Sequence, residues 1–188
     1  MTIHDTHPFA DPEGAREPGR RLRGRLTGTV SLWTAGGALA GGERAGLTVS
    51  SWLVVAGEET RVVAMLDPDS DLLDALERTG RAVVALLTWE QRALADVFAG
   101  QAPAPGGMFA QAAFVDTDHG PRLASATTWA DVRLESTATV GWSTQVTCVA
   151  EHVEIGGEDG EDDPDDEGRR APLEHRRGRY RRPGAASR

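Results

Sequence analysis

The apolar run AVVALLT, residues 82–88, limits the possible folds more than any other part of the sequence. An apolar run without polar alternation is typical of a strand that is buried on both faces. Helical patterns flank it. Residues 67–80 predict a helix with Asp67 as its N-cap, Pro68 at its first position and Gly80 at its end. The TWEQ segment that starts at Thr88 is a capping box, and it predicts a second helix through Phe98.

Most of the remaining segments have strand patterns. Residues 25–35, 45–56 and 61–67 alternate or combine apolar and β-branched residues, and Gly141 divides two further strand-rich stretches. Three strands therefore precede the first helix, one strand separates the two helices, and several strands follow. Because successive strands usually pair with one another, this order predicts a small, mainly β antiparallel barrel with helices packed outside it.

Composition suggests how the chain is divided. We expect a flexible leader at 1–20, a single domain at 21–183 that contains an acidic loop at 157–170, and a flexible tail at 184–188. The leader has no apolar stretch typical of a secretory signal, and no apolar run approaches the 18 residues of a membrane span. Cys148 is the only cysteine, which fits a reducing, cytoplasmic location.

The inventory of reactive side chains excludes several function classes. All 20 basic residues are arginine, so Schiff-base chemistry and a phosphate-loop lysine are excluded. The net charge of −9 argues against nucleic-acid binding. No metal site is expected from the histidine spacings, and Asp116, Asp118 and His119 are interpreted as a solvated turn. Any redox chemistry would therefore need a cofactor.

One strand-like segment carries more hydroxyl groups than a strand needs. In AGLTVSSWL, residues 45–53, Thr48, Ser50 and Ser51 place three hydroxyl groups within four positions. Serine adds little to the stability of a strand. Either these hydroxyl groups face solvent or a polar ligand meets them.

Together, several segments resemble the flavin reductase-like family, whose fold is the FMN-binding split barrel. The resemblance begins with AGLTVSSWLVV at 45–55, continues through Ser70 and QRALADVFA at 91–99, and includes GPRLASATTWADVRLE from Gly120. It ends with APLEHRRGRYRR at 171–182 and covers about residues 22–183. The resemblance implies a mainly β, antiparallel Greek-key split barrel with a few short flanking helices.

The resemblance also implies a flavin site across this strand and the next one. The hydroxyl groups would contact the ring edge and the ribityl phosphate, and the helix N-terminus near Ser70 would favour the phosphate. For Phe98, simple core packing is the alternative to a flavin contact. The site residues implied are Thr48, Val49, Ser50, Ser51, Leu66, Asp67, Ser70, Phe98 and Ala99.

The implied activity is hydride transfer from NAD(P)H to a bound flavin. FMN is the expected cofactor, with FAD or the deazaflavin F420 as alternatives; a homodimer and a monooxygenase partner that receives reduced flavin are also implied. No catalytic side chain is assigned, because hydride transfer itself requires no acid or base. Neither nucleic acid nor a membrane is expected as a partner.

One departure from the family keeps other functions open. Many reductases of this family carry a G-D-H motif where this chain has Gly141, Trp142 and Ser143. The chain could therefore be a flavin-binding protein, or an FMN-dependent oxidase or reductase that uses another electron donor. A third class is an interaction module whose arginine-rich segment 176–182 binds an acidic partner.

Overall fold

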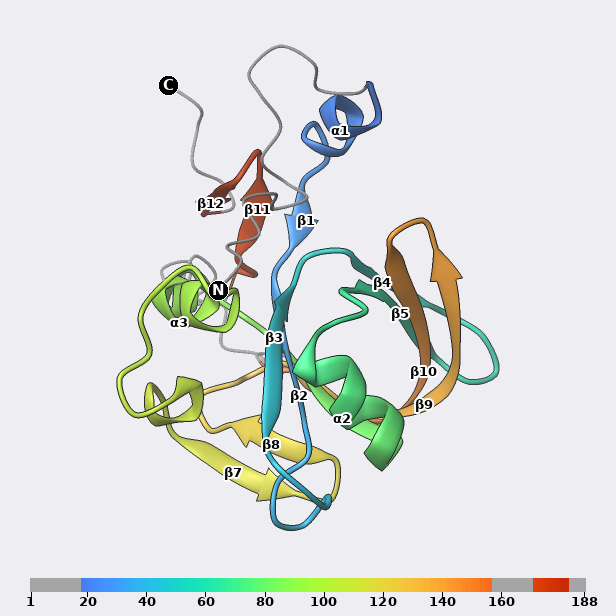
Figure 1. Cartoon of the computed structure of the whole chain (residues 1–188), viewed down its shortest axis with the longest axis vertical. Helices are drawn as coiled ribbons and strands as arrows, with labels where there is room; N and C mark the ends of the chain where they lie inside the picture. The colour runs from blue at the N-terminus through green and yellow to red at the C-terminus, as the bar shows by residue number, and fades with distance from the viewer. Residues whose placement is uncertain (1–17, 157–170, 183–188) are drawn as a thin grey trace, which may run out of the picture.

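The computed structural model describes residues 18–156 and 171–182 (Figure 1). The acidic loop at 157–170, the tail from 183 and most of the predicted leader lie outside the described residues. Its helices are α1 (Pro18–Arg23), α2 (Asp71–Thr79) and α3 (Arg92–Phe98), with short 3-10 turns η1 (Trp89–Gln91) and η2 (Met108–Ala110). The strands are β1 (Gly28–Thr29), β2 (Ser31–Ala35), β3 (Ala45–Val49), β4 (Trp52–Val55), β5 (Arg61–Leu66), β6 (Arg81–Leu86), β7 (Phe114–Thr117), β8 (Gly120–Leu123), β9 (Trp129–Val140), β10 (Ser143–Glu154), β11 (Glu174–Arg176) and β12 (Arg179–Arg181).

Seven strands form the main sheet in the order β3-β2-β6-β9-β10-β5-β4, and all neighbours in it are antiparallel. The two edge strands, β3 and β4, are consecutive in the chain and are separated only by Ser50 and Ser51. A link of two residues spans only about 10 Å. The sheet must therefore curl until its two edges nearly meet, and the two serines lie at the split between them.

Local irregularities help the sheet to curl. The pairing of β9 with β10 shifts register between Thr147 and Cys148, and again between Ala150 and His152. Such bulges bend a strand and increase its twist. The prediction of a mainly β, antiparallel split barrel with short flanking helices is confirmed. The prediction of one continuous strand over 45–56 is wrong, because the chain leaves one edge of the sheet and joins the other at Ser50.

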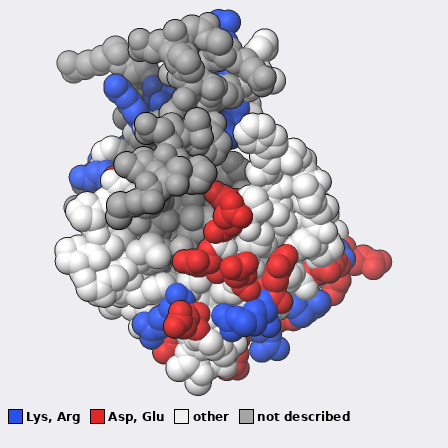
Figure 2. Space-filling model, in the orientation of Figure 1, with Lys and Arg blue, Asp and Glu red and all other residues white. Residues whose placement is uncertain are grey.

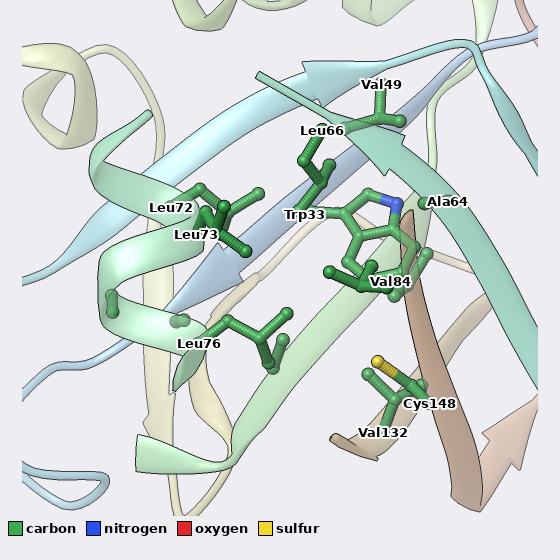
Figure 3. Close-up of a cluster of buried hydrophobic side chains, with 14 of the residues drawn as sticks. Trp33, Val49, Ala64, Leu66, Leu72, Leu73, Leu76, Val84, Val132 and Cys148 are labelled. Atoms are coloured by element: carbon green, nitrogen blue, oxygen red, sulfur yellow. The ribbon is translucent and has the colours of Figure 1, made fainter. Parts of the chain in front are cut away.

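Strand β6 lies inside the sheet, between β2 and β9, and is buried on both faces, as its apolar run predicts. On one face, Ala82 and Val84 join a core around the fully buried Trp33 (Figure 3). Helix α2 covers this core with Leu72, Leu73 and Leu76. The apolar face of an amphipathic helix thus closes the side of the barrel.

The ends of the helices follow local capping rules, with one correction. The N-cap of α2 is Ser70, whose hydroxyl group accepts a hydrogen bond from the Leu73 amide at 3.4 Å, so the prediction of Asp67 was wrong. Asp67 instead accepts a hydrogen bond from the Asp69 amide at 3.0 Å, in the turn that precedes the helix. Gly80 ends α2 in a left-handed conformation, as predicted. The Thr88 amide donates to Gln91 Oε1 at 2.9 Å, which confirms the capping box.

A three-stranded sheet, β1-β11-β12, lies at one end of the barrel beside α1, and the hairpin β7-β8 lies at the other end (Figure 1). The small sheet joins the two ends of the described chain, because Gly28 pairs with His175 and Thr29 pairs with Glu174. No helix within 18–156 and 171–182 is long and apolar enough to cross a membrane.

Candidate functional site

A cavity of about 660 Å³ opens at the split of the barrel. The barrel contributes Ser50, Ser51 and the strand residues 63–65, and the small sheet contributes Gly28 and His175. A volume of this size falls in the range of pockets that hold small molecules and cofactors. The two serines that separate β3 from β4 are therefore also part of its wall.

Backbone contacts hold the two walls of the cavity in place. A Cβ atom at Gly28 would lie 2.4 Å from the Ser50 carbonyl oxygen, so only glycine allows β1 to approach this closely. Trp52 Nε1 donates a hydrogen bond to the Thr29 carbonyl at 2.9 Å. The Met65 amide donates to the Ser51 carbonyl, also at 2.9 Å. The shape of the cavity thus depends on tertiary contacts around the two serines.

The hydroxyl groups of Ser50 and Ser51 remain available to a ligand. Ser50 is half-buried, Ser51 is exposed, and both line the cavity. Within the described part of the chain, neither hydroxyl group takes part in a hydrogen bond. This geometry leaves two adjacent donors at the edge of a largely apolar wall that also contains Leu53, Val63 and Met65.

The other predicted residues of β3 and β5 serve the fold in this structure. The Thr48 hydroxyl group donates to the Ala95 carbonyl at 2.8 Å and so ties β3 to α3. Val49 and Leu66 are buried in the core around Trp33. None of the three lines the cavity. Their predicted contacts with a cofactor remain predictions.

The predicted phosphate position at the start of α2 is separate from the cavity. Asp67 and Ser70 are absent from its lining. The Ser70 hydroxyl group donates to the Asp67 carbonyl at 2.7 Å and caps the helix, so its hydrogen bonds are already used locally. Asp71 and Asp74 add negative charge to the first turn.

Phe98 and Ala99 lie at the end of α3, on the other side of β3. Phe98 is buried in a second core, where its ring meets Phe109 edge-on with 5.2 Å between centroids and also contacts Phe114. A Cβ atom at Gly46 would lie 2.7 Å from the Phe98 ring, so the aromatic cluster requires glycine there. Ala99 is the C-cap of α3. Core packing accounts for the position of Phe98 in this structure.

Sequence reasoning missed the basic end of the cavity. Arg23, His175 and Arg177 line it, together with Gln145 from β10. Burial, together with the nearby charge of Arg23, lowers the pKa of His175, so its ring is neutral near pH 7. Of these residues, the quoted family segment 171–182 contains only His175 and Arg177, and nothing in its pattern shows that they face the two serines.

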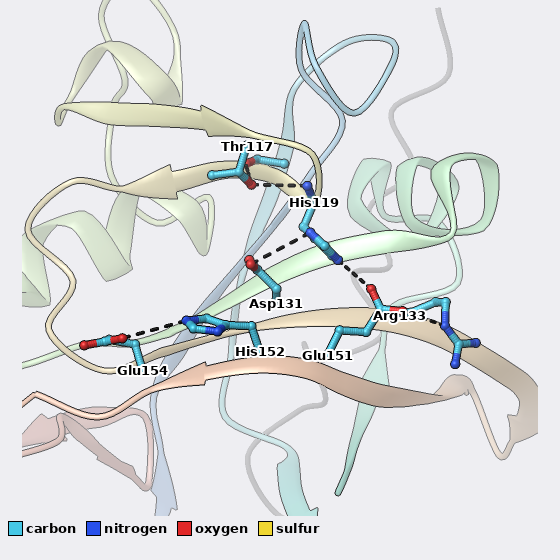
Figure 4. A network of polar contacts seen from close by, with 8 residues as sticks. Thr117, His119, Asp131, Arg133, Glu151, His152 and Glu154 are labelled. Carbon is cyan, nitrogen blue, oxygen red and sulfur yellow. Dashed lines mark hydrogen bonds and ion pairs between the residues drawn. The ribbon is translucent and has the colours of Figure 1, made fainter. Parts of the chain in front are cut away.

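A second polar cluster lies away from the cavity, around the turn of the β7-β8 hairpin (Figure 4). His119 Nε2 lies 2.8 Å from Glu151 Oε2, and Glu151 Oε1 accepts a hydrogen bond from Arg133 Nε at 2.8 Å. The hydrogen bond with His119 lowers the pKa of Glu151, and burial raises the pKa of Asp131. The prediction of a solvated turn is wrong for His119, whose side chain is mostly buried against β9 and β10.

Two further side chains are excluded as reactive groups of the cavity. Cys148 is fully buried in the core, and burial raises the pKa of its thiol to about 12, so it stays protonated and inert. Trp142 is 84% exposed at the turn between β9 and β10 and does not line the cavity. No cluster of three or more metal-ligating side chains occurs among the described residues.

The arrangement therefore suits a flat, phosphate-bearing cofactor better than chemistry by side chains alone. Apolar walls can enclose a ring, the two serine hydroxyl groups can bind its polar edge, and the arginines can meet an anionic group. The residues present fit such a group, although they provide no nucleophile.

Comparisons with known proteins agree with this description. The family model described as "Flavin reductase like domain" matches residues 23–184. A comparison with curated protein sequences found no match. The family match includes both walls of the cavity.

Solved structures share the fold at low sequence identity. The NADH:FAD oxidoreductase SgcE6 of Streptomyces globisporus C-1027 has a TM-score of 0.72 and 22% identity, over 93% of this chain and 96% of that one. The styrene monooxygenase flavin reductase of Pseudomonas putida S12 has a TM-score of 0.68 and 21% identity, over 87% and 95%. Nitrilotriacetate monooxygenase component B of Mycobacterium thermoresistibile has a TM-score of 0.71 and 20% identity, over 87% and 83%.

Proposed function

Because this chain belongs to the flavin reductase like family, we propose that it is a flavin-dependent oxidoreductase that passes hydride from NAD(P)H to FMN. The observation that carries the proposal is the cavity at the split of the barrel, which is lined by two adjacent serines and by basic residues; within 18–156 and 171–182 the two serine hydroxyl groups make no hydrogen bond. A bound flavin supplies the redox chemistry, by accepting hydride at its ring.

The residues of the chain bind and orient the two reactants. Ser50 and Ser51 would donate hydrogen bonds to the polar edge of the ring, while Leu53, Val63 and Met65 would pack against its apolar part. Apolar walls exclude water and fix the orientation in which the nicotinamide ring approaches the flavin ring. No proton has to be held by a side chain for this transfer, which agrees with the lack of a carboxylate in the described lining.

FMN is the proposed cofactor and FAD is the alternative. The cavity volume does not by itself separate the two. A similar structure, the Streptomyces oxidoreductase, is described with NAD and FAD fragments. We also propose a monooxygenase as the partner that receives reduced flavin, because two of the similar structures are components of monooxygenases. The proposed location is the cytoplasm, which suits a single, buried cysteine.

One observation favours a second function. The turn between β9 and β10 carries Trp142, which points into solvent, and Ser143 where many family members have the histidine of the G-D-H motif. Without that histidine, the protein would bind flavin and either receive electrons from another donor or perform no turnover.

Visible spectroscopy of the purified protein tests the proposed function. With FMN bound, we expect a yellow protein whose flavin absorbance bleaches within seconds after NADH or NADPH is added without oxygen. The physical reason is that the cavity would hold the nicotinamide ring and the flavin ring in a reactive orientation. Hydride transfer then becomes an effectively unimolecular step, which is faster than the same reaction between free molecules.

The outcomes separate the candidates. A yellow protein that bleaches with dithionite but with neither nicotinamide nucleotide would support the flavin-binding alternative. A colourless protein that takes up no flavin, and whose arginine-rich segment binds an acidic partner in a salt-sensitive way, would contradict both flavin functions.

The edge strand β4 supports the proposal of a homodimer. Leu53, Val54 and Val55 are consecutive and all exposed. An exposed apolar edge strand tends to pair with another chain, because its backbone hydrogen-bonding groups have no partner strand. We expect light scattering to give twice the chain mass of 20.0 kDa. Val54→Glu should shift the protein to monomer, whereas the control Val115→Glu, an exposed position on β7, should not. A wild-type protein that stays monomeric at all concentrations would contradict the proposal.

A further inference from the structure

The charged side chains around the turn of the β7-β8 hairpin form a compact group away from the cavity (Figure 4). We name four of them the His119 cluster: His119, Asp131, Arg133 and Glu151. The histidine comes from the hairpin turn, Asp131 and Arg133 come from β9, and Glu151 comes from β10. None of the four lines the cavity. The cluster therefore connects the hairpin to the two longest strands of the main sheet.

A β-bulge at Glu151 brings the cluster together. The register of β9 and β10 shifts between Ala150 and His152, so Glu151 is an extra residue without a partner in β9. In a regular strand, successive side chains point to opposite faces of the sheet. The bulge breaks this alternation, and the Glu151 carboxylate reaches His119 on the face that carries Asp131. Without the extra residue, Glu151 would point away from the hairpin.

His119 has a carboxylate on each side of its ring. Its Nε2 lies 2.8 Å from Glu151 Oε2, and its Nδ1 lies 3.8 Å from Asp131 Oδ2. A neutral imidazole carries a proton on only one ring nitrogen, so the lone pair of the other nitrogen would face a carboxylate. The imidazolium form carries a proton on both. Because the side chains of His119 and Asp131 are each only 15% exposed, solvent screens this difference weakly.

Asp131 provides a second, independent observation. Its Oδ1 is buried and has no hydrogen-bond partner within the described residues, and its one ion pair there is with His119. A buried carboxylate of this kind costs free energy unless a positive charge or a proton compensates it. Burial raises the pKa of Asp131, whereas the hydrogen bond with His119 lowers the pKa of Glu151. One additional proton, held by His119 and Asp131, therefore suits the cluster better than none.

The surroundings of the cluster contain charges of both signs. They are Arg122 of β8, His152 of β10, Arg44 before β3, and Asp116 and Asp118 of the hairpin itself. Arg44 donates to both carboxylate oxygens of Asp116 at 2.8 Å, and the Arg122 guanidinium lies over the Trp129 ring, 4.3 Å from its centroid. Figure 2 shows acidic side chains over the lower half of the molecule with basic ones between them, and Figure 1 places the hairpin at this end. The net charge of −9 also favours binding of a proton over its loss.

We propose that the His119 cluster is a proton-binding site that fastens the β7-β8 hairpin to β9 and β10, so that loss of the proton at higher pH weakens this attachment. The folded state then keeps a proton that the unfolded chain has lost, and the free energy of unfolding falls as pH rises through the titration of the cluster. On the acid side, Glu151 contributes stability only while it is ionised, because its pKa is lowered in the folded state. The attachment is therefore strongest at mildly acidic pH. The proposal does not depend on flavin binding.

Two measurements on the full chain test the site. Long-range proton–nitrogen NMR spectra show which ring nitrogens carry a proton, and we expect both nitrogens of His119 to carry one at about pH 6. Urea unfolding between about pH 6 and pH 9 should show a decrease in the folding equilibrium constant that exceeds the decrease in His119→Gln by about threefold to tenfold. Hydrogen exchange of the amides at 114–117 and 120–123, corrected for the intrinsic rates, should accelerate over the same pH range.

His152→Gln is the matched control, because it removes an exposed histidine next to Glu151 on the same strand. It should retain the wild-type pH dependence, whereas Glu151→Gln, which removes one of the two carboxylates, should move it to lower pH. A His119 ring with only one protonated nitrogen at about pH 6 would overturn the proposal. The same holds if His119→Gln keeps the full wild-type pH dependence. Should His119→Gln fail to fold, the NMR spectra of the wild-type protein alone decide the question.

Discussion

Replacing both Ser50 and Ser51 by leucine is expected to weaken FMN binding by at least about 100-fold, which corresponds to roughly 2.7 kcal/mol. The change removes two hydroxyl donors from the cavity wall and fills the space in front of it with branched side chains. Each lost hydrogen bond contributes about 1 kcal/mol, and overlap with the ring adds to this loss. Equilibrium titration of the flavin-free protein, followed by the quenching of flavin fluorescence, measures the effect.

Two further variants show which part of this effect comes from hydrogen bonding. Ser50→Ala with Ser51→Ala removes the donors without filling the cavity, and it should weaken binding by about tenfold to 30-fold. Ser136→Leu places the same side chain at an exposed position of β9 outside the cavity and should change nothing. A leucine double variant that folds normally and retains wild-type affinity would show that the ring binds elsewhere.

Replacing Trp33 by alanine is expected to have the largest effect on stability, a loss of about 3–5 kcal/mol in the free energy of unfolding. The indole is fully buried between α2 and the sheet and lies at the centre of the main core (Figure 3). Its Nε1 also donates a hydrogen bond to Ser31 Oγ at 3.0 Å, and Ser31 Oγ donates to the Val49 carbonyl at 3.0 Å. Urea unfolding followed by circular dichroism measures the loss.

The same contacts connect the core to the candidate site. Val49 immediately precedes Ser50, so the hydrogen bonds from Trp33 through Ser31 fix the end of β3 at the cavity. Trp142→Ala is the matched control, because this tryptophan is exposed, and its loss should change stability by less than about 0.5 kcal/mol. Equal effects of the two substitutions would contradict the assignment of Trp33 to the core.

Local sequence rules identified several elements because each depends on neighbours in the chain. The run at 82–88 predicted a doubly buried strand, Gly80 predicted the end of α2, and the capping box at Thr88 predicted η1 and α3. The choice between Asp67 and Ser70 as N-cap was not local. Both residue types can cap a helix. In the structure, β5 ends at Leu66, which pairs with Thr144, and a turn at 67–70 follows before the helix begins. The position of the N-cap therefore depends on where the strand pairing ends.

The sequence by itself determined the family, the strand-dominated fold and the two adjacent serines, because apolar patterns and short motifs are properties of contiguous residues. Only the tertiary structure decided that these serines join the two edges of one sheet and that Arg23 and Arg177 share their cavity. The two arginines lie near opposite ends of the chain, and the pairing of Gly28 with His175 in β1 and β11 brings them together. The proximity of such distant residues depends on backbone hydrogen bonds between strands that are far apart in the chain. It therefore cannot be predicted from a pattern of neighbouring residues.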